Sequence, residues 1–146
     1  MDSRSVSPIT VAEVEDAVRR YWNVAASKRS AELQSFYLET ASIFATTSKR
    51  LEPARLVTAR RTREYMDSNS RMSYELGAIN VDLLTRASAV AAYTTRWRAD
   101  QIAKPSAKGG KTSEENITHL RVTHVFQRQE NGSLKIIHEH LSVCSG

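Results

Sequence analysis

The last strand pair of this chain, from Leu120 to Val143, constrains its fold more than any other stretch. Two runs of alternating apolar and polar residues flank the tripeptide Glu130-Asn131-Gly132, and an Asn-Gly step between such runs is the strongest short-range signal for a β-hairpin. All four histidines of the protein lie on these strands or beside them: His119, His124, His138 and His140. We therefore expect any pocket chemistry to lie along this hairpin.

The length of the turn decides which histidines share a face of the sheet. A three-residue turn at Glu130 to Gly132 pairs Phe126 with Ile136, His124 with His138, and Val122 with His140. Because side chains alternate along a strand, all three histidines then share a face with the apolar Phe126 and Ile136. A two-residue turn at Asn131-Gly132 pairs His124 with Glu139 instead and separates it from the other two. We favour the three-residue turn, which makes the hairpin one wall of an apolar pocket with a polar tip.

The residues before the hairpin predict three helices. Thr10 and Glu13 can form a capping box, which starts a first helix with the apolar face Val11, Val14, Val18, Tyr21, Trp22 and Ala25. Ser30 can cap a short second helix whose inward side is Leu33, Phe36 and Tyr37. A third helix is expected from Pro53 to about Asp67, with one side formed by Leu56, Ala59, Arg63 and Met66.

The other segments predict strands and connections. Residues 41–46 form a short strand, and residues 72–83 and 87–100 alternate with period two around Thr85-Arg86, which predicts a large hairpin. Residues 104–116 are rich in Gly, Ser and Lys and predict a mobile connection. Residues 1–9 predict a flexible tail, and residues 10–146 a single domain. Helices followed by long strands belong to the α+β class.

Composition and charge narrow the classes of partner. The chain has 40% hydrophobic and 25% charged residues, as globular proteins do, and it lacks the run of ~20 apolar residues that crosses a bilayer. Without a secretory signal at the N-terminus, we expect a cytoplasmic protein with no membrane partner. Most of the net charge of +5 comes from residues 49–71, a predicted helix and its flanks. Because no basic strand with interleaved aromatic residues accompanies it, we expect no nucleic-acid partner.

Two groups of side chains are candidates for binding chemistry. His138 and His140 are two residues apart, so on a regular strand they point to one side and could share a metal. No third ligand is present in both registers, and we predict no metal and no cofactor. The simpler alternative is that the histidines are hydrogen-bonded residues of the sheet. Arg96 could hold an anion in a concave sheet, or it could be a solvated arginine at a strand end.

The chain resembles a known superfamily in Tyr21-Trp22, in residues 31–44 and above all in RVTHVFQRQENGSLKIIHEHLS, from Arg121 to Ser142. These segments are similar to SnoaL-like, ketosteroid-isomerase-like proteins of the nuclear transport factor 2-like superfamily, near the group with the association domain of calcium/calmodulin-dependent protein kinase II. The likeness spans nearly the whole chain from Thr10. It implies a cone-shaped, strongly curved, mixed and largely antiparallel sheet wrapped around three helices of the N-terminal half. It also implies a pocket between sheet and helices, and a homodimer formed through the sheet.

The resemblance implies two classes of function. The first is an isomerase, cyclase or hydrolase of a small apolar or carbonyl-bearing ligand, in which His124, His138 and His140 are catalytic. Arg96 would orient that ligand, and the ligand-binding residues would also include Tyr21, Trp22, Phe126 and Ile136. Steroid isomerases use an aspartate base, and the segment FATTSKRLEPARL offers no aspartate for that role. The alternative is a non-catalytic ligand-binding or dimerisation module that uses the same pocket.

Overall fold

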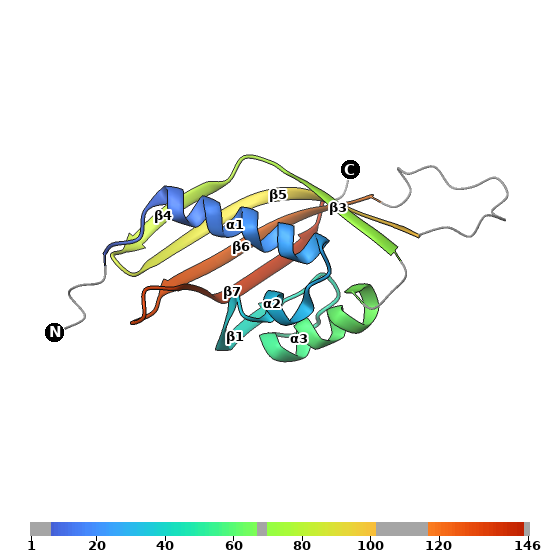
Figure 1. The fold of residues 1–146 in the computed structure, drawn as a ribbon, viewed down its shortest axis with the longest axis horizontal. Helices are drawn as coiled ribbons and strands as arrows, with labels where there is room; N and C mark the ends of the chain where they lie inside the picture. Colours follow the sequence, from blue (N-terminus) through green and yellow to red (C-terminus); the bar gives the residue numbers. More distant parts are fainter. Residues whose placement is uncertain (1–6, 67–69, 102–116, 145–146) are drawn as a thin grey trace, which may run out of the picture.

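The computed structural model describes residues 7–66, 70–101 and 117–144 (Figure 1), so the predicted connection at 104–116 lies outside the described residues. The helices are α1 (Val11–Ala26), α2 (Ser30–Gln34) and α3 (Ala54–Arg61), which continues into a π-helical segment, η2 (Thr62–Met66). The strands are β1 (Tyr37–Phe44), β2 (Glu52–Pro53), β3 (Ser70–Leu76), β4 (Asn80–Thr85), β5 (Ser88–Gln101), β6 (Ile117–Arg128) and β7 (Leu134–Val143). None of the helices in these ranges is long and apolar enough to cross a membrane.

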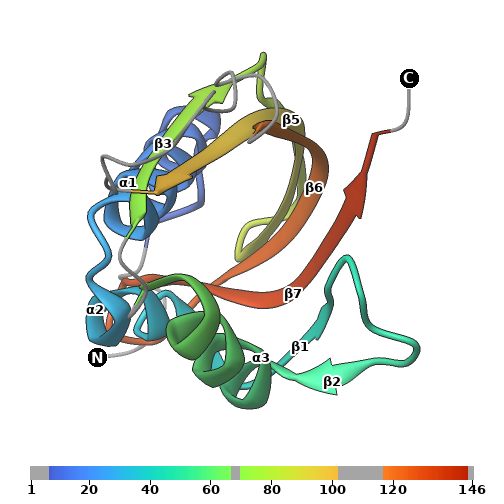
Figure 2. The same ribbon diagram turned by 90° about the vertical axis from the view of Figure 1, so that its right-hand side faces the viewer.

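The strands form one seven-stranded sheet that curves around α1. Its order is β2-β1-β7-β6-β5-β3, and β4 also pairs with β5. Strands β1 and β7 run parallel, and the other pairs are antiparallel. Figure 2 shows α1 and α3 on the concave, inner side of the sheet. The predicted α+β class, with a curved mixed sheet around helices from the N-terminal half, is confirmed.

The start of α1 is held by the predicted capping box and by the sheet. The hydroxyl of Thr10 accepts from the backbone N–H of Glu13 at 3.2 Å, and the Glu13 carboxylate accepts from the backbone N–H of Thr10 at 3.0 Å. Arg128 of β6 also donates to this carboxylate, at 2.7 Å. Ile9, in the predicted tail, is 3% exposed, and its N–H donates to the carbonyl of Arg86. The packed part of the chain thus begins before the helix.

The final hairpin combines the two registers that its turn allows. Next to the turn, Phe126 pairs with Ile136, as the three-residue turn predicts. The register then shifts, and Ile137 is left without a partner while His124 pairs with Glu139. The predicted pairing of His124 with His138, and that of Val122 with His140, is therefore wrong. A β-bulge of one residue explains this, because it turns every side chain beyond it to the opposite face.

The predicted long strand before the hairpin at residues 85–88 is broken into β3 and β4. Both strands pair with β5, and the break falls at Gly77, whose N–H donates to the carbonyl of Thr94 at 2.8 Å. A Cβ at Gly77 would lie 2.6 Å from the hydroxyl oxygen of Thr94. This close approach to β5 favours glycine, because a larger residue would force the hydroxyl of Thr94 to move.

Helix α3 buries a different face from the one predicted. Ala54, Val57 and Thr58 are buried, whereas Leu56 is 51% exposed. Pro53 precedes the helix as its cap residue and ends β2. Directly before α3, β2 pairs with β1, and apolar periodicity does not contain this contact between distant residues. The same face continues one turn further to Arg61, since residues four apart lie on one side of a helix.

Candidate functional site

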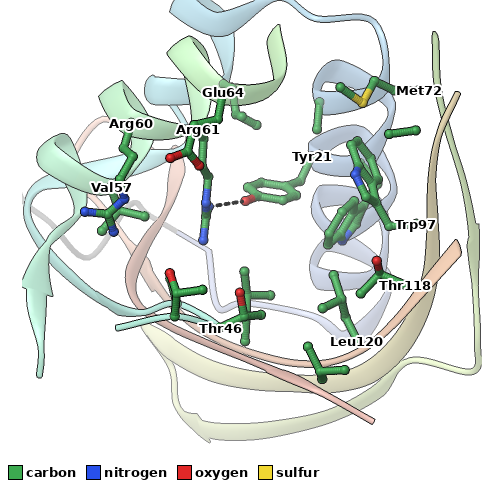
Figure 3. Close-up of a pocket in the computed structure, with 18 residues that line it drawn as sticks. Tyr21, Thr46, Val57, Arg60, Arg61, Glu64, Met72, Trp97, Thr118 and Leu120 are labelled. Atoms are coloured by element: carbon green, nitrogen blue, oxygen red, sulfur yellow. Dashed lines mark hydrogen bonds between the residues drawn. The ribbon is translucent and has the colours of Figure 1, made fainter. Parts of the chain in front are cut away.

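A cavity of about 310 Å³ lies between α1, α3 and the inner face of the sheet (Figure 3). Trp22 from α1 and Trp97 from β5 stand on one side, with ring centroids 5.5 Å apart. Most of the remaining wall is aliphatic: Ala25, Leu33, Ala45, Val57, Met72, Ala99, Leu120, Leu141 and Val143. The polar lining residues are Tyr21, Thr46, Thr47, Arg60, Arg61, Glu64 and Thr118. The cavity therefore suits a small, largely apolar molecule with a few polar atoms.

Arg61 and Glu139 form a buried ion pair at one end of this cavity. Arg61 lines the cavity with a side chain 16% exposed, whereas the Glu139 side chain is fully buried behind it. Nη2 of Arg61 donates to Oε2 of Glu139 at 2.8 Å. The pair joins α3 to β7, and the charge of the guanidinium that faces the cavity is offset by the carboxylate beneath it.

The hydroxyl groups of two tyrosines lie against the carboxylate of this ion pair. The hydroxyl of Tyr37 lies 2.6 Å from Oε1 of Glu139, and that of Tyr21 lies 3.0 Å from the same oxygen. The two hydroxyl oxygens are 2.6 Å apart. Nη1 of Arg61 donates to both hydroxyl oxygens, at 3.4 Å to Tyr21 and 3.3 Å to Tyr37. Figure 3 marks the contact between Arg61 and Tyr21 with a dashed line.

His124 supports the carboxylate from the core side. Its Nε2 lies 2.7 Å from Oε1 of Glu139, and its Nδ1 lies 3.2 Å from the hydroxyl of Tyr93. Nε1 of Trp22 donates to that hydroxyl at 2.7 Å. His124 is fully buried and does not line the cavity. A hydrogen-bonded network thus runs from Trp22 on the cavity wall, through the core, to Tyr21 and Arg61 on the cavity wall again.

Burial and neighbouring charges shift the pKa values of the ionisable groups in this network. Burial acts to raise the pKa of Glu139, but the charge of Arg61 and the hydrogen bonds from His124 and Tyr37 outweigh it and keep the pKa well below its usual range. Burial, together with the negative charge of Glu139, raises the pKa of Tyr21 and of Tyr37 well above that of an ordinary phenol. Burial also opposes the charge of Arg61, yet Glu139 keeps its pKa above the usual value. Around neutral pH the carboxylate is therefore ionised and both phenols are protonated.

The structure brings together some of the residues predicted to bind a ligand. Tyr21 and Trp22 both line the cavity. Phe126 and Ile136 lie in the fully buried core and not on the cavity wall. Arg96 is on the outer face, where its exposed side chain pairs with the exposed Glu75 at 3.0 Å. Side chains alternate along β5, and because Tyr93, Thr95 and Trp97 face inward, Arg96 faces outward. Arg96 is therefore the solvated arginine that was the alternative interpretation of the sequence.

The bulge places the other two candidate histidines on the outer face of the sheet. Nδ1 of His138 lies 3.0 Å from the hydroxyl of Ser42, and His140 is exposed. Both rings contact Phe44 of β1, with centroids 6.4 and 5.9 Å away. Only His124, of the three histidines proposed as catalytic, belongs to the network behind the cavity. In the part of the chain that the structure describes, no group of three or more His, Cys, Asp or Glu side chains is placed to hold a metal ion.

Sequence reasoning missed Arg61, Tyr37 and Glu139. Glu139 faces His124 in the two-residue register, so that alternative already contained their contact. Arg61 follows Ala54, Val57 and Thr58 at the spacing of one helical face, and this spacing is the signal in the sequence that could have found it. Tyr37 was expected at the end of a helix, but it begins β1, and only the parallel pairing of β1 with β7 brings it to Glu139.

The sequence matches the model of one protein family over nearly its whole length. The SnoaL-like domain model covers residues 14–145. No curated protein matches the chain. The resemblance to SnoaL-like proteins that the sequence suggested is confirmed.

Solved structures share the fold at low sequence identity. An NTF2-like protein of unknown function from Pseudomonas putida KT2440 has a TM-score of 0.71 and 19% identity, over 92% of this chain and 87% of its own. A putative calcium/calmodulin-dependent protein kinase II association domain from Xanthomonas campestris has a TM-score of 0.71 and 19% identity, over 99% and 97%. A putative scytalone dehydratase from Novosphingobium aromaticivorans has a TM-score of 0.72 and 12% identity, over 90% and 82%.

Proposed function

Since this chain belongs to the SnoaL-like domain family, we propose that it binds a small, largely apolar molecule whose carbonyl oxygen or similar acceptor lies against Arg61. One observation carries the proposal: a mostly aliphatic and aromatic cavity has a guanidinium at one end, held there by a fully buried carboxylate. A few fixed polar groups in an apolar wall are typical of sites that orient small ligands. The similarity to the putative scytalone dehydratase from Novosphingobium aromaticivorans supports a small organic ligand.

The charges around the cavity favour an uncharged ligand. Glu139 offsets Arg61 at 2.8 Å, and Glu52 offsets Arg60 at 2.8 Å. Glu64 adds a carboxylate to the lining. A carboxylate ligand would lose its bound water on entering this site, and without a net positive charge the site would not compensate for that loss, so its binding is unfavourable. The role of the network is to hold donors in place, because the shifted pKa values of Glu139, Tyr21 and Tyr37 all oppose proton transfer among them.

Binding can be followed with the protein's own fluorescence. Trp22 and Trp97 are its only two tryptophans, and both line the cavity, so a ligand there should change their emission. We expect acetophenone, an apolar ring with one carbonyl, to give a saturable change in emission. Ala99→Phe places a ring in the cavity and should abolish that change. Ala92→Phe is the matched control on the outer face of the same strand and should leave it intact. An unsaturable change, or equal binding by both variants, would refute the proposal.

A second candidate function is proton abstraction next to a bound carbonyl, and the position of Glu64 favours it. Its carboxylate is the only one in the described lining, and it could act as base while Arg61 stabilises the developing negative charge on oxygen. Catalysis of this kind would exchange the methyl protons of acetophenone for deuterium in D₂O, which NMR measures directly. Glu64→Gln should stop the exchange without weakening binding. Exchange no faster than in buffer would leave binding as the function.

We also propose that a second copy of the chain covers the outer face of the sheet. In the described residues the helices lie on the inner side (Figure 2), while the outer side presents Phe44, 37% exposed, next to His138 and His140. The supporting observation is this aromatic and imidazole cluster on a face that no helix covers. Homodimerisation through the sheet is also what the family resemblance implies.

A further inference from the structure

The hydrogen bonds behind the cavity fix the proton positions of His124. An indole nitrogen can only donate, so Nε1 of Trp22 uses the hydroxyl oxygen of Tyr93 as its acceptor at 2.7 Å. The single proton of Tyr93 then needs another acceptor, and within the described ranges the atom in position is Nδ1 of His124 at 3.2 Å. Nδ1 is therefore the bare nitrogen of the ring. The proton lies on Nε2 and is donated to Oε1 of Glu139 at 2.7 Å.

The proton positions of the two tyrosines follow from three distances. Tyr37 lies 2.6 Å from Oε1 of Glu139, the two phenol oxygens lie 2.6 Å apart, and Tyr21 lies 3.0 Å from Oε1. Two protons serve these three contacts. Oxygens 2.6 Å apart attract each other only with a proton between them, whereas a 3.0 Å separation tolerates its absence. Tyr37 therefore donates to Glu139, and Tyr21 donates to Tyr37.

The hydroxyl protons of the three tyrosines and the ring proton of His124 thus all point along the network toward Glu139. Tyr21 lines the cavity, and because its proton is donated to Tyr37, its oxygen can act toward a ligand only as an acceptor. Its contact from Nη1 of Arg61 is long, at 3.4 Å, so this acceptor is only weakly used. Beside it, Arg61 presents N–H groups. The polar end of the cavity consequently offers an acceptor and a donor side by side.

We infer that the ligand of this cavity carries a hydrogen-bond donor next to its acceptor, as a carboxamide or an α-hydroxy ketone does, with the acceptor on Arg61 and the donor on Tyr21. The inference rests on the proposed binding function and names the substrate class more narrowly. A simple ketone would occupy Arg61 and leave the oxygen of Tyr21 with only the long 3.4 Å contact from Nη1 of Arg61 as an accepted hydrogen bond, whereas a ligand N–H or O–H would add a second one.

Benzamide and acetophenone test this, because an NH₂ group in one replaces a CH₃ group of nearly the same size in the other. Tryptophan fluorescence titrations of the wild-type protein should show benzamide binding about 5- to 10-fold more tightly, the value of one hydrogen bond. If Tyr21 instead offered its proton, the amide N–H₂ would lie unpaired and acetophenone would bind more tightly. Equal or reversed affinities therefore overturn the inference and leave the binding function standing. Failure of both probes to bind overturns the proposed function, and the inference with it.

Two further measurements check the role of Tyr21 and of the network behind it. Tyr21→Phe should lower the affinity for benzamide to that for acetophenone, while Tyr74→Phe, which removes a phenol outside the cavity lining, should preserve the preference. Nitrogen-15 NMR of histidine distinguishes a bare Nδ1 from a protonated one and needs no variant. A His124 signal with a protonated Nδ1 at neutral pH would contradict the proton positions and overturn the inference.

Discussion

The guanidinium of Arg61 and the carboxylate of Glu139 meet at 2.8 Å, Nη2 to Oε2, and connect the last residue of α3 to the middle of β7. Seventy-eight residues separate them in the chain. No short-range pattern predicts such a contact, and the three side chains that hydrogen-bond to the pair, Tyr21, Tyr37 and His124, come from α1, β1 and β6. The stability of the fold and the proposed ligand binding therefore depend on the same ion pair.

Arg61→Leu should lower the free energy of unfolding by about 3–5 kcal/mol, because it leaves the fully buried carboxylate of Glu139 without its counter-charge. Urea denaturation measures this change. Arg96→Leu is the matched control, since it breaks an ion pair with Glu75 in which both side chains are more than half exposed. Its effect should stay within about 1 kcal/mol. Similar losses in the two variants would show that the buried pair contributes no more than a surface pair.

The sequence predicted the fold well where local signals agree with tertiary packing. The capping box at Thr10 and Glu13 and the stripe through Tyr21 and Trp22 appear in α1 as expected, although Val11 is 42% exposed. The turn beside Gly132 also formed in the favoured length, and Gly132 has the positive φ of 91° that such a turn requires.

The candidate site was predictable only in part because a one-residue bulge and a helix rotation decide it. Ile137 has no signal that marks it as a bulge, yet it moves Glu139 inward and His138 and His140 outward. On α3, Leu56 is more apolar than Thr58, but the sheet buries Thr58 and with it the face of Arg61. Both outcomes depend on contacts between distant elements, which periodicity does not contain.

Acid should destabilise the protein partly through Glu139. Its folded-state pKa is lowered from the ordinary value of 4.5, burial being outweighed by Arg61 and by hydrogen bonds. Below about pH 4.5 the unfolded chain takes up this proton first, so the contribution of Glu139 is present above that pH and is lost as the pH falls. Urea midpoints measured from pH 6 downward should therefore fall. In Glu139→Gln the fall should be shallower. An unchanged pH dependence in Glu139→Gln would contradict the lowered pKa.

Alkali should unfold the protein before its buried tyrosines ionise. Burial raises the pKa of Tyr21, Tyr37 and Tyr93 above the ordinary 10.0. A group with a raised pKa contributes stability that is complete below pH 10 and is lost as the pH rises further, since only the unfolded chain releases the proton. The late part of the tyrosinate absorbance change should therefore coincide with the loss of circular dichroism. A smooth titration of all five tyrosines in the folded protein would contradict this.

Phe44→Glu should convert a homodimer into a monomer, because it places a charge at the exposed ring that contacts His138 and His140 on the outer face of the sheet. Burying an unpaired carboxylate in an interface is strongly unfavourable. Light scattering after gel filtration should give twice the mass of 16.4 kDa for the wild type and that mass for the variant. Leu56→Glu is the control, because Leu56 is 51% exposed on the outer side of α3, and it should remain dimeric. A wild-type protein that is monomeric at high micromolar concentration, or a Phe44→Glu variant that stays dimeric, would refute an interface at this face.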